Sequence, residues 1–346
     1  MKKILWGIIG PGHIANRFAD GLKESSSGNL IAIASTNDER RKIFGDKYQI
    51  DSSMRFKNYN EIINCSEIDA IYISTPHNLH AEWTIKAAGR GKHVLCEKPG
   101  AVNLEEGKKI IKTVKEAGIF YMEGFMYRCH PQIKILLKLL KEKKIGDIKH
   151  VESSFGFDTE KSNPDSRLFN INLAGGSILD VGLYPISFAR MIAGASNEKK
   201  FLNPIKLTGT AKIGTTGVDE VAFANLEFEN GITAKASTAI RQLMDNNAII
   251  KGTKGSIELN EPWTPGKEGG PFVSSIKIKI DNKTEIIDVK VNEHLFYFEA
   301  EQSSQCIQKN KFEIPYPGMT WDDTLGNLKT LDQWRKAIGY KLDIEK

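Results

Sequence analysis

Three polar side chains in this sequence have the types needed to exchange a proton near neutral pH. Asp180 and Tyr184 lie four residues apart, which on a helix places both side chains on one face. An unperturbed tyrosine titrates near about pH 10, and a neighbouring lysine favours its phenolate form. Lys98 would therefore form an acid/base pair with Tyr184 if the fold brings them together. The alternative for Asp180 and Tyr184 is a helix cap and a packing residue.

Lys98 belongs to the segment Glu97-Lys98-Pro99, which directly follows the apolar run at residues 93–96. Ligands of α/β folds bind at the carboxyl ends of the strands. A lysine held there beside a nicotinamide could hydrogen-bond a reacting oxygen and lower the pKa of a neighbouring acid. The alternative is that Glu97 and Lys98 form an exposed ion pair at the end of the strand.

A glycine-rich loop near the start of the chain has the pattern of a dinucleotide-binding site. Residues 10–15 read GPGHIA, which fits G-x-G-x-x-G/A, and they follow an apolar run and precede a helical pattern. Gly10 permits a tight turn, and Gly12 lets the backbone approach a pyrophosphate. The N–H groups of the first helical turn, at His13 and Ile14, would then face the phosphates. In this context we favour dinucleotide binding over a loop that only joins strand to helix.

The end of the second predicted strand distinguishes NADP from NAD. An acidic residue there would hold a ribose 2′-hydroxyl, and an arginine would accommodate a 2′-phosphate. The chain has neutral hydrogen-bonding residues at this place: Ser35, Thr36 and Asn37. Asp38 suits the first turn of the next helix, and Arg40 or Arg41 could reach a phosphate or lie on the helix surface. The sequence therefore favours NADP, with NAD as the alternative.

The histidines and cysteines do not have the spacing of a metal site. His77 and His80 fall in the turn before a helix, and His93 and Cys96 would point to opposite faces of a strand. A zinc site needs four converging ligands, so no metal is expected. The four cysteines show no C-x-x-C spacing and are expected to be reduced thiols of a cytoplasmic protein.

The elements that must position these residues fall into two parts. In the first, short apolar runs alternate with helical patterns, which predicts a doubly wound parallel sheet, a Rossmann-type α/β domain. The predicted strands are residues 3–9, 30–35, 70–74, 93–96 and 119–122. One helix is predicted to start at His13, and three more are predicted at 38–48, 81–88 and 103–117. We assign residues 1–124 to this dinucleotide-binding domain.

After about residue 125 the pattern becomes that of an α+β domain with a large, mostly antiparallel open sheet. Asn230-Gly231 lies between strand-like runs at 221–228 and 232–238, which is a strong hairpin signal. Residues 276–280 alternate strictly, as in a half-exposed strand. Helices are predicted at 132–142, from about Gly175 to 192, at 295–308 and at 321–337, a strand at 149–157, a loop at 158–172 and a turn at 252–255. We assign residues 125–346 to this substrate and dimerisation domain.

The composition of the 346 residues excludes several classes of protein. Hydrophobic residues make up 40% and charged residues 26%, which is ordinary for a soluble globular chain. The net charge of +5 is spread along the chain, and the lysine-rich run at 138–144 suits a solvated helix face, so no nucleic acid is expected as a partner. No run approaches the roughly 18 apolar residues of a membrane helix, and no signal peptide is apparent.

Taken together, these residues resemble the Gfo/Idh/MocA family of oxidoreductases over nearly the whole chain. The resemblance is carried by residues 7–15, the turn from Thr75 to Ala81, Cys96-Glu97-Lys98-Pro99 and Tyr127-Arg128-Cys129-His130-Pro131, and also by 175–185 and 323–327. It implies an N-terminal Rossmann domain and a C-terminal domain whose open sheet often forms the dimer interface. A homodimer or homotetramer through that sheet is therefore expected.

The resemblance also implies roles for individual residues. Tyr184 would be the general acid/base, Lys98 would assist it and steer the substrate, and Asp180 would orient the reacting hydroxyl. Further cofactor contacts are implied for Thr75, Pro76, Asn78, His80, Glu97, Lys98 and Arg167. The reaction would be hydride transfer between NADP(H) and a CH–OH carbon of a small molecule.

Two positions depart from the related branch that contains dihydrodiol dehydrogenases, xylose dehydrogenases and glucose–fructose oxidoreductase. Met126 stands where that branch often has Trp, and Thr36 stands where NADP-using relatives often have Arg. We therefore predict an aldose or sugar-like polyol as substrate. A trans-dihydrodiol or a sugar nucleotide is the alternative within the family, and a non-catalytic dinucleotide-sensing regulatory protein is the alternative of another class.

Overall fold

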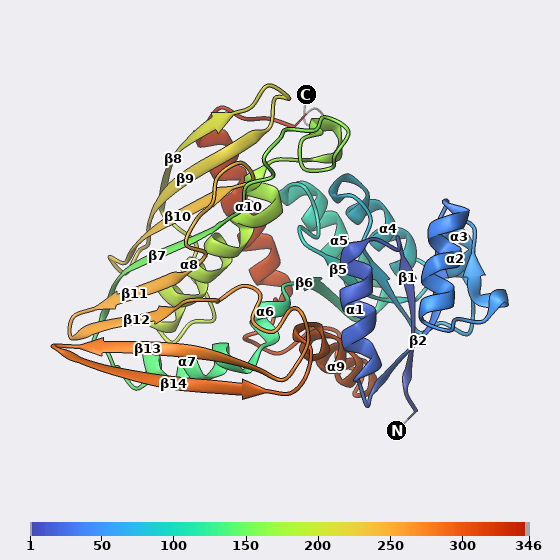
Figure 1. The fold of residues 1–346 in the computed structure, drawn as a ribbon, viewed down its shortest axis with the longest axis horizontal. Coiled ribbons are helices and arrows are strands. Elements are labelled where there is room, and N and C mark those ends of the chain that lie inside the picture. Colours follow the sequence, from blue (N-terminus) through green and yellow to red (C-terminus); the bar gives the residue numbers. More distant parts are fainter. Residues whose placement is uncertain (1, 343–346) are drawn as a thin grey trace.

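The computed structural model describes residues 2–342, which form two β-sheets side by side (Figure 1). The first sheet is wholly parallel, with the strand order β3-β2-β1-β4-β5-β6. Its strands are β1 (Ile4–Ile9), β2 (Gly28–Ala34), β3 (Arg55–Phe56), β4 (Ala70–Ile73), β5 (His93–Glu97) and β6 (Tyr121–Gly124). The order reverses direction at β1, which places the carboxyl ends of β1, β4 and β5 next to one another.

The helices of this first part begin where side chains can cap them. Asn37, Asn58 and Asn103 each accept a hydrogen bond from a backbone N–H three residues later and so start a helix. The helices are α1 (His13–Lys23), α2 (Asp38–Lys47), α3 (Tyr59–Asn64), α4 (His80–Ala88) and α5 (Leu104–Ala117). All predicted strands and helices of this part are present. The short β3 and α3 had no sequence prediction, because neither is long enough to show a period.

The second sheet has eight strands in the order β14-β13-β12-β11-β7-β10-β9-β8, and only β7 and β10 pair in parallel. Its strands are β7 (Ile148–Gly156), β8 (Lys206–Ile213), β9 (Asp219–Glu227), β10 (Thr233–Ala239), β11 (Ala248–Gly252), β12 (Gly255–Leu259), β13 (Phe272–Ile280) and β14 (Lys283–Val291). The predicted Asn-Gly hairpin joins β9 to β10, with Gly231 at φ +78°. The predicted open, mostly antiparallel sheet is therefore confirmed.

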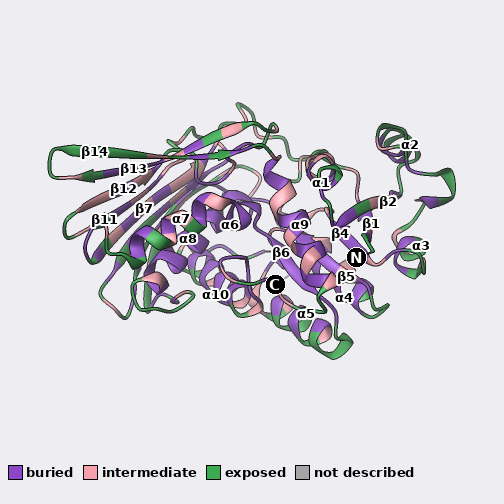
Figure 2. Ribbon diagram, turned by 90° about the horizontal axis from the view of Figure 1, so that it is seen from below, coloured by how far each residue is buried: buried purple, intermediate pink, exposed green. Residues whose placement is uncertain are grey.

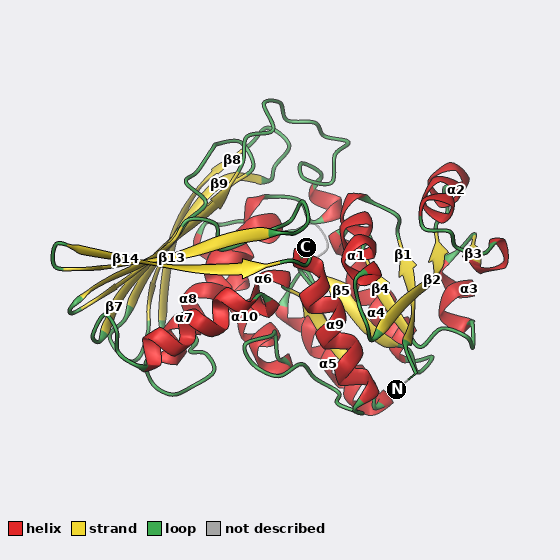
Figure 3. Ribbon diagram, turned by 60° about the horizontal axis from the view of Figure 1, so that its bottom comes forward, coloured by secondary structure: helices red, strands yellow, loops and turns green. Residues whose placement is uncertain are grey.

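Helices cover one face of this second sheet and leave the other open. They are α7 (Pro131–Lys141), α8 (Leu183–Ala195) and α10 (Trp321–Ala337). The short α6 (Met126–Cys129) packs against α7 and α9, and α9 (Leu295–Gln308) packs against α1, β1 and β2 of the first part. Figure 3 shows α7, α8 and α10 between the two sheets. On β9, Ala222, Ala224 and Leu226 are buried towards the helices, whereas Phe223 and Asn225 are exposed on the opposite face. Figure 2 shows the same alternation of exposed and buried positions along the strands.

The helix predicted to start at Gly175 begins later and differently. Gly176 has φ +110° and is not helical, and the chain then makes a five-residue π-helical turn at Ile178–Gly182 before α8. A π-turn is wider than an α-turn. Asp180 lies in this wide turn and Tyr184 in the first turn of α8, so the helix that carries the pair is not a regular α-helix.

The last two helices join the two sheets. Trp6 Nε1 donates to Ser304 Oγ at 3.0 Å, which fixes α9 on β1, and the N–H of Leu104 donates to Asp332 Oδ2 at 2.9 Å, which fixes α10 on α5. Both partners on α9 and α10 come from the C-terminal part of the sequence. The division at residue 124 coincides with the end of β6 and stays a prediction, because these two helices contact both parts.

One stretch, Ile171–Ala195, which ends in α8, is long and apolar enough by composition to cross a membrane. In the structure, 94% of its most apolar window is buried inside the protein, and α8 packs against β7 and β10. This stretch is a core helix, whose apolar surface is covered by the second sheet.

Candidate active site

The lysine predicted from the Glu97-Lys98-Pro99 motif lies just beyond β5, on a segment held at its backbone. The N–H of Lys98 donates to Glu97 Oε2 at 3.2 Å, and Glu97 accepts a second hydrogen bond from the hydroxyl of Tyr72. Glu97 is buried, so the prediction of an exposed ion pair at this place does not apply. Burial raises the pKa of Glu97, although Lys98 and Tyr72 act in the opposite direction.

His80 ties this segment to the loop after β4. Its Nδ1 lies 2.7 Å from the carbonyl oxygen of Pro99, and its Nε2 lies 2.7 Å from the carbonyl oxygen of Thr75. Burial lowers the pKa of His80 to about 4, so the neutral ring donates to one of these carbonyls at a time. Both ring nitrogens face the protein backbone, which makes His80 a brace between the two loops.

Lys98 and Asp180 meet although 82 positions separate them in the sequence. Lys98 Nζ donates to the backbone oxygen of Asp180 at 2.7 Å and lies 3.5 Å from Asp180 Oδ1. Arg167 Nη1 donates to the same Oδ1 at 2.8 Å. Burial alone would raise the pKa of Asp180, but Lys98 and Arg167 outweigh it and hold that pKa well below its usual range. Asp180 is therefore a carboxylate at neutral pH.

His77 also belongs to this cluster, which sequence reasoning missed. Its Nδ1 lies 3.0 Å from the carbonyl oxygen of Ala174, and its Nε2 lies 3.3 Å from Arg167 Nη1 and 3.9 Å from Asp180 Oδ1. Arginine can only donate, so Nε2 accepts and Nδ1 carries the hydrogen. Burial and the Arg167 charge lower the pKa of His77 well below its usual value. The sequence signal that indicates His77 is its position in the turn from Thr75 to Ala81. From the sequence alone, His77 was considered only as a metal ligand.

Tyr184 is buried beside Lys98 and is surrounded by aromatic rings. The aromatic cluster consists of Phe125, Tyr127, Phe155 and Trp263, whose ring centroids lie 5.2–6.1 Å from that of Tyr184. Lys98 Nζ lies 5.4 Å from the centroid of the Tyr184 ring. The hydroxyl of Tyr184 donates to Met126 Sδ at 3.3 Å. Trp263 comes from the loop between β12 and β13, and its Nε1 donates to the carbonyl oxygen of Ser154.

The acidity of Tyr184 differs from the sequence expectation. Burial, followed by the charges of Glu97 and Asp180, raises the pKa of Tyr184 well above its usual value. Lys98 was expected to favour the phenolate, but its ammonium group hydrogen-bonds to Asp180 and does not contact the phenol oxygen. In this arrangement Tyr184 holds its proton and is a donor.

The glycine loop follows the carboxyl end of β1 and lies against the end of the neighbouring strand β4. Gly10 has φ +88°, and a Cβ there would lie 3.1 Å from the carbonyl oxygen of Ser74. Gly12 has an ordinary φ of −82°, and a Cβ there would meet no protein atom within 4 Å. Gly12 is also the N-cap residue of α1 and has no side chain that could accept a hydrogen bond. The N–H groups of His13 and Ile14 therefore point out of the helix end without a side-chain cap.

The loop after β4 carries two buried oxygens that have no hydrogen-bond partner in the protein, Thr75 Oγ1 and Asn78 Oδ1. Pro76, between them, is the N-cap of the short 3-10 turn His77–Leu79. Buried polar atoms without partners are rare in folded proteins. The open helix end, the free space over Gly12 and these two oxygens therefore fit a dinucleotide along the ends of β1 and β4.

The end of β2 separates the two candidate arginines. Asn37 Oδ1 accepts from the N–H of Arg40 and caps α2, while Ser35 Oγ accepts from the N–H of Asn37. Arg41 donates to the carbonyl oxygen of Ser35 at 2.7 Å and to Asp38 at 2.6 Å. Arg40 and Thr36 are exposed, and within residues 2–342 neither side chain has a hydrogen bond or ion pair. Arg40 is the arginine that remains available to a phosphate.

Comparison with known proteins assigns the chain to a family. Residues 4–125 match the oxidoreductase family with an NAD-binding Rossmann fold, and residues 133–258 match the GFO/IDH/MocA C-terminal domain. The chain is 30% identical over 341 residues to the trans-1,2-dihydrobenzene-1,2-diol dehydrogenase of Mus musculus, covering 96% of each chain. The chain belongs to the Gfo/Idh/MocA oxidoreductase family.

Further proteins are similar to the chain in sequence or in fold. The D-xylose 1-dehydrogenase (NADP(+)) 2 of Haloferax volcanii is 30% identical over 257 residues, 74% of this chain and 76% of that protein. The crystal structure of the aldose-aldose oxidoreductase from Caulobacter crescentus, complexed with glycerol, has a TM-score of 0.84 at 25% identity and covers 97% of both chains. A 3-ketoreductase from Actinomadura kijaniata with NADP and TDP-benzene has a TM-score of 0.84 at 26% identity, covering 97% of this chain and 98% of that one.

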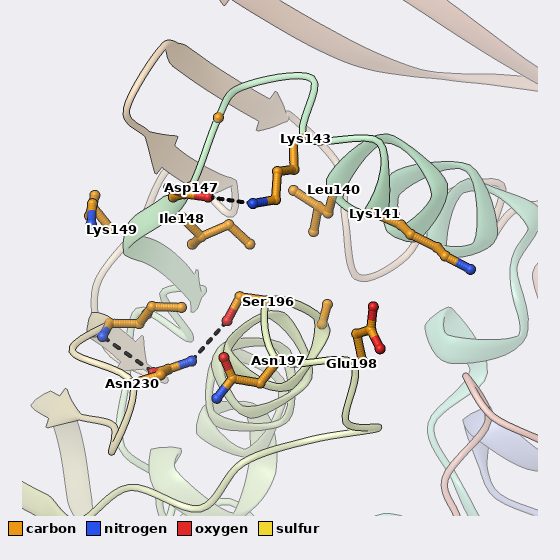
Figure 4. A pocket seen from close by; sticks show the side chains of 13 residues that line it. Leu140, Lys141, Lys143, Asp147, Ile148, Lys149, Ser196, Asn197, Glu198 and Asn230 are labelled. Carbon is orange, nitrogen blue, oxygen red and sulfur yellow. Dashed lines mark hydrogen bonds and ion pairs between the residues drawn. The ribbon is translucent and has the colours of Figure 1, made fainter.

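A pocket on the surface lies far from this family site. It is formed where α7 ends, β7 begins, α8 ends and the β9–β10 hairpin turns (Figure 4). Four of its polar groups are paired with one another: Lys143 bonds to Asp147 at 3.0 Å, and Asn230 Nδ2 donates to Ser196 Oγ at 2.8 Å. Its lysines include part of the run at 138–144 that was predicted to be a solvated face. None of its lining residues belongs to the candidate active site.

Proposed function

We propose that the protein is an NADP(H)-dependent dehydrogenase that transfers a hydride between the nicotinamide ring and a CH–OH carbon of an aldose or sugar-like polyol. The observation that carries the proposal is the meeting of Lys98, Asp180 and Tyr184 just beyond the carboxyl end of β5, at the sheet edge where the glycine loop follows β1. Tyr184 is the general acid/base, and Lys98 assists it. Three chemistry-bearing side chains from two distant segments converge at the same edge of the parallel sheet as the open helix end, as a hydride-transfer site requires.

The residues divide the work of the reaction. The nicotinamide, when bound, supplies or accepts the hydride. Tyr184, kept protonated by burial, gives its proton to the carbonyl oxygen during reduction, and the phenolate that this leaves takes the proton of the hydroxyl during oxidation. Asp180, kept ionised by Lys98 and Arg167, accepts a hydrogen bond from the reacting hydroxyl and orients it. The aromatic cluster excludes water from the proton transfer.

The choice of NADP rests on the end of β2. Arg40 is exposed and unpaired there, and no carboxylate occupies the place of a ribose 2′-hydroxyl ligand, because Asp38 pairs with Arg41. Ser35, Thr36 and Asn37 supply neutral hydrogen bonds to the ribose. The Haloferax volcanii relative is named as NADP-dependent, which agrees with this choice, and NAD is the alternative.

The choice of a sugar-like substrate rests on the relatives and on Met126. A relative named as a xylose dehydrogenase and a similar structure named as an aldose–aldose oxidoreductase support an aldose. Met126 in place of Trp replaces a flat ring beside the Tyr184 hydroxyl with a flexible thioether. The aromatic cluster and the Mus musculus relative favour a trans-dihydrodiol as the second candidate. A sugar nucleotide is a third.

The open face of the second sheet supports a homodimer or homotetramer. Phe223, Val273 and Ile286 are exposed on that face, on β9, β13 and β14. An exposed sheet face with large apolar side chains is typical of an interface between subunits. A cytoplasmic location agrees with the unpaired cysteines Cys65, Cys96, Cys129 and Cys306.

A titration of the purified protein with NADPH and NADH, followed by protein and nicotinamide fluorescence, tests the proposal first. NADPH is expected to bind more tightly than NADH, and aldoses and trans-dihydrodiols are then screened with NADP. Preference for NADH would contradict the role of Arg40 and leave the dehydrogenase intact. Binding of a dinucleotide without turnover of any CH–OH compound would favour the regulatory sensor, and binding of neither would contradict both.

A further inference from the structure

A buried glutamate on β6 holds the backbone that carries Lys98. Glu123 is 1% exposed. Its Oε1 accepts a hydrogen bond from the N–H of Gly100 at 2.8 Å, and its Oε2 accepts one from the hydroxyl of Thr324 at 2.8 Å. Gly100 follows Lys98 by two residues, and Thr324 lies in the first turn of α10. One carboxyl group therefore joins the Lys98 segment to the helix that spans both sheets.

The segment at 98–100 rests directly on the side chains of β6. A Cβ added to Gly100 would lie 2.5 Å from the hydroxyl oxygen of Tyr121 and 3.3 Å from Glu123 Cγ. Such distances leave no room for a side chain at position 100. The close approach is what allows the Glu123 carboxyl to reach the Gly100 N–H, and a shift of Glu123 would be transmitted to this segment.

The three residues of the segment have separate anchors. The N–H of Lys98 is held by Glu97, and the carbonyl of Pro99 is held by His80. The N–H of Gly100 has Glu123 as its anchor. Glu97 and His80 belong to the strand and the helix that flank the cofactor site, whereas Glu123 connects the segment to α10 through Thr324. Glu123 thus links the Lys98 backbone to the second part of the molecule.

We infer that Glu123 is a positioning residue for Lys98, acting through the N–H of Gly100 to keep the Lys98 amine against Asp180 and beside Tyr184. The inference rests on the proposed function, in which Lys98 assists Tyr184. Glu123 itself makes no contact with Lys98, Asp180 or Tyr184 among the hydrogen bonds and ion pairs of residues 2–342.

The strength of the hydrogen bond from the Gly100 N–H to Glu123 depends on pH, because the Glu123 carboxyl group can be protonated. Burial raises the pKa of Glu123 to about 7, against the Gly100 and Thr324 hydrogen bonds. The titratable and charged groups that face it are Cys96 on β5, Tyr121 on β6, Asp323 on α10 and Arg190 on α8. An ionised carboxylate accepts a stronger hydrogen bond than a protonated one. The segment is therefore held more firmly as the pH rises through about 7.

Two variants of Glu123 and one control test the inference. Glu123→Gln keeps an oxygen for the Gly100 N–H and an amide that can donate to Thr324, whereas Glu123→Ala removes both contacts. Thr324→Val removes only the far contact and serves as the matched control. We expect Glu123→Ala to lower kcat by about 10- to 100-fold with KM for the dinucleotide within about threefold, because misplacing a catalytic group costs turnover rather than cofactor binding.

Rescue of kcat by Glu123→Gln and the pH profile of kcat distinguish a positioning role of Glu123 from a role in folding alone. Glu123→Gln is expected to recover kcat to within about threefold of the wild-type protein at low pH and to lack the rise through about pH 7 that the wild-type protein shows. Equal losses in Gln and Ala, an unchanged pH profile in Gln, or wild-type kcat in Ala would each overturn the inference. If Glu123→Ala does not unfold cooperatively, the Gln and wild-type profiles decide.

Amide hydrogen exchange on the free protein makes the test independent of the substrate. The peptide that contains residues 98–104 is expected to exchange faster in Glu123→Ala than in the wild-type protein, in Glu123→Gln or in Thr324→Val. Unchanged exchange in Ala would overturn the inference even if every substrate screen succeeds. A third outcome is faster exchange in Glu123→Ala together with a wild-type protein that oxidises no substrate. This outcome would support the role of Glu123 in holding the Gly100 N–H and would contradict the proposed dehydrogenase activity.

Discussion

The end of the candidate site proposed to bind the dinucleotide (the dinucleotide end) and the end proposed to transfer the proton (the proton-transfer end) are built in opposite ways. At the dinucleotide end, one loop of six residues provides the turn, the free space and the open helix end, through backbone groups at 10–15. At the proton-transfer end, Lys98, Asp180 and Tyr184 are joined by His77 and Arg167, and these residues come from four segments of the chain. A backbone-built site depends on local conformation, whereas a site built from side chains depends on how the two sheets pack.

This difference predicts how substitutions separate. Changes at the proton-transfer end should lower turnover and leave cofactor affinity nearly unchanged. Changes in the glycine loop should do the reverse. A variant that lowers both equally would show that the two ends are coupled more closely than the contacts between them indicate.

The largest effect is expected from Tyr184→Phe, which removes only the hydroxyl. Turnover should fall by at least about 100-fold, because general acid/base catalysis contributes on that order. The affinity for the dinucleotide should change by less than about twofold, since the ring still packs in the aromatic cluster. Steady-state kinetics with a fluorescence titration measure both. Full activity of Tyr184→Phe at every pH would remove Tyr184 from the acid/base role.

Lys98→Ala should follow, with a loss of about 10- to 100-fold in kcat. The variant leaves Asp180 with Arg167 as its remaining cation at hydrogen-bond distance, so the carboxylate stays ionised and the fold should persist. Lys98→Met is the matched control, because it keeps the length of the side chain and lacks the charge. If Met restores the activity that Ala loses, Lys98 acts through packing and not through its charge.

Two glycines of one loop should respond differently. Gly10→Ala forces an L-residue into φ +88° and should lower the free energy of unfolding by about 1 kcal/mol or more. Gly12→Ala should leave stability within about 0.5 kcal/mol, because its Cβ meets no protein atom, and should weaken dinucleotide binding by about tenfold. Thermal unfolding and the NADPH titration measure the two effects. Unchanged binding in Gly12→Ala would contradict the position of the pyrophosphate.

The smallest effect is expected at the end of β2. Arg40→Ala should reduce the preference for NADPH over NADH by about five- to tenfold, the value of a partly exposed contact to a phosphate. Arg41→Ala should change that preference less and the stability more, because Arg41 is bound to Ser35 and Asp38. The reverse order would show that the phosphate displaces Arg41 from these partners.

The sequence by itself determined the parts of the protein that depend on short-range pattern. Apolar runs alternating with helical spacing specified the parallel sheet, Asn230-Gly231 specified a hairpin, and the residues at 10–15 specified the turn and the open helix end. These features follow from the conformational preferences of a few consecutive residues, so no distant contact is needed to predict them.

Only the tertiary structure decided which side chains share the proton-transfer end. The meeting of Lys98 with Asp180 bridges 82 positions, and the π-turn that presents Asp180 has no periodic signature. The tertiary structure also pairs Arg41 with Asp38 and raises the pKa of Tyr184. It brings the Glu123 carboxylate within hydrogen-bond distance of the Gly100 N–H. The physical reason is that burial and hydrogen-bond partners set the state of a side chain, and both come from residues that are neighbours only in the folded chain.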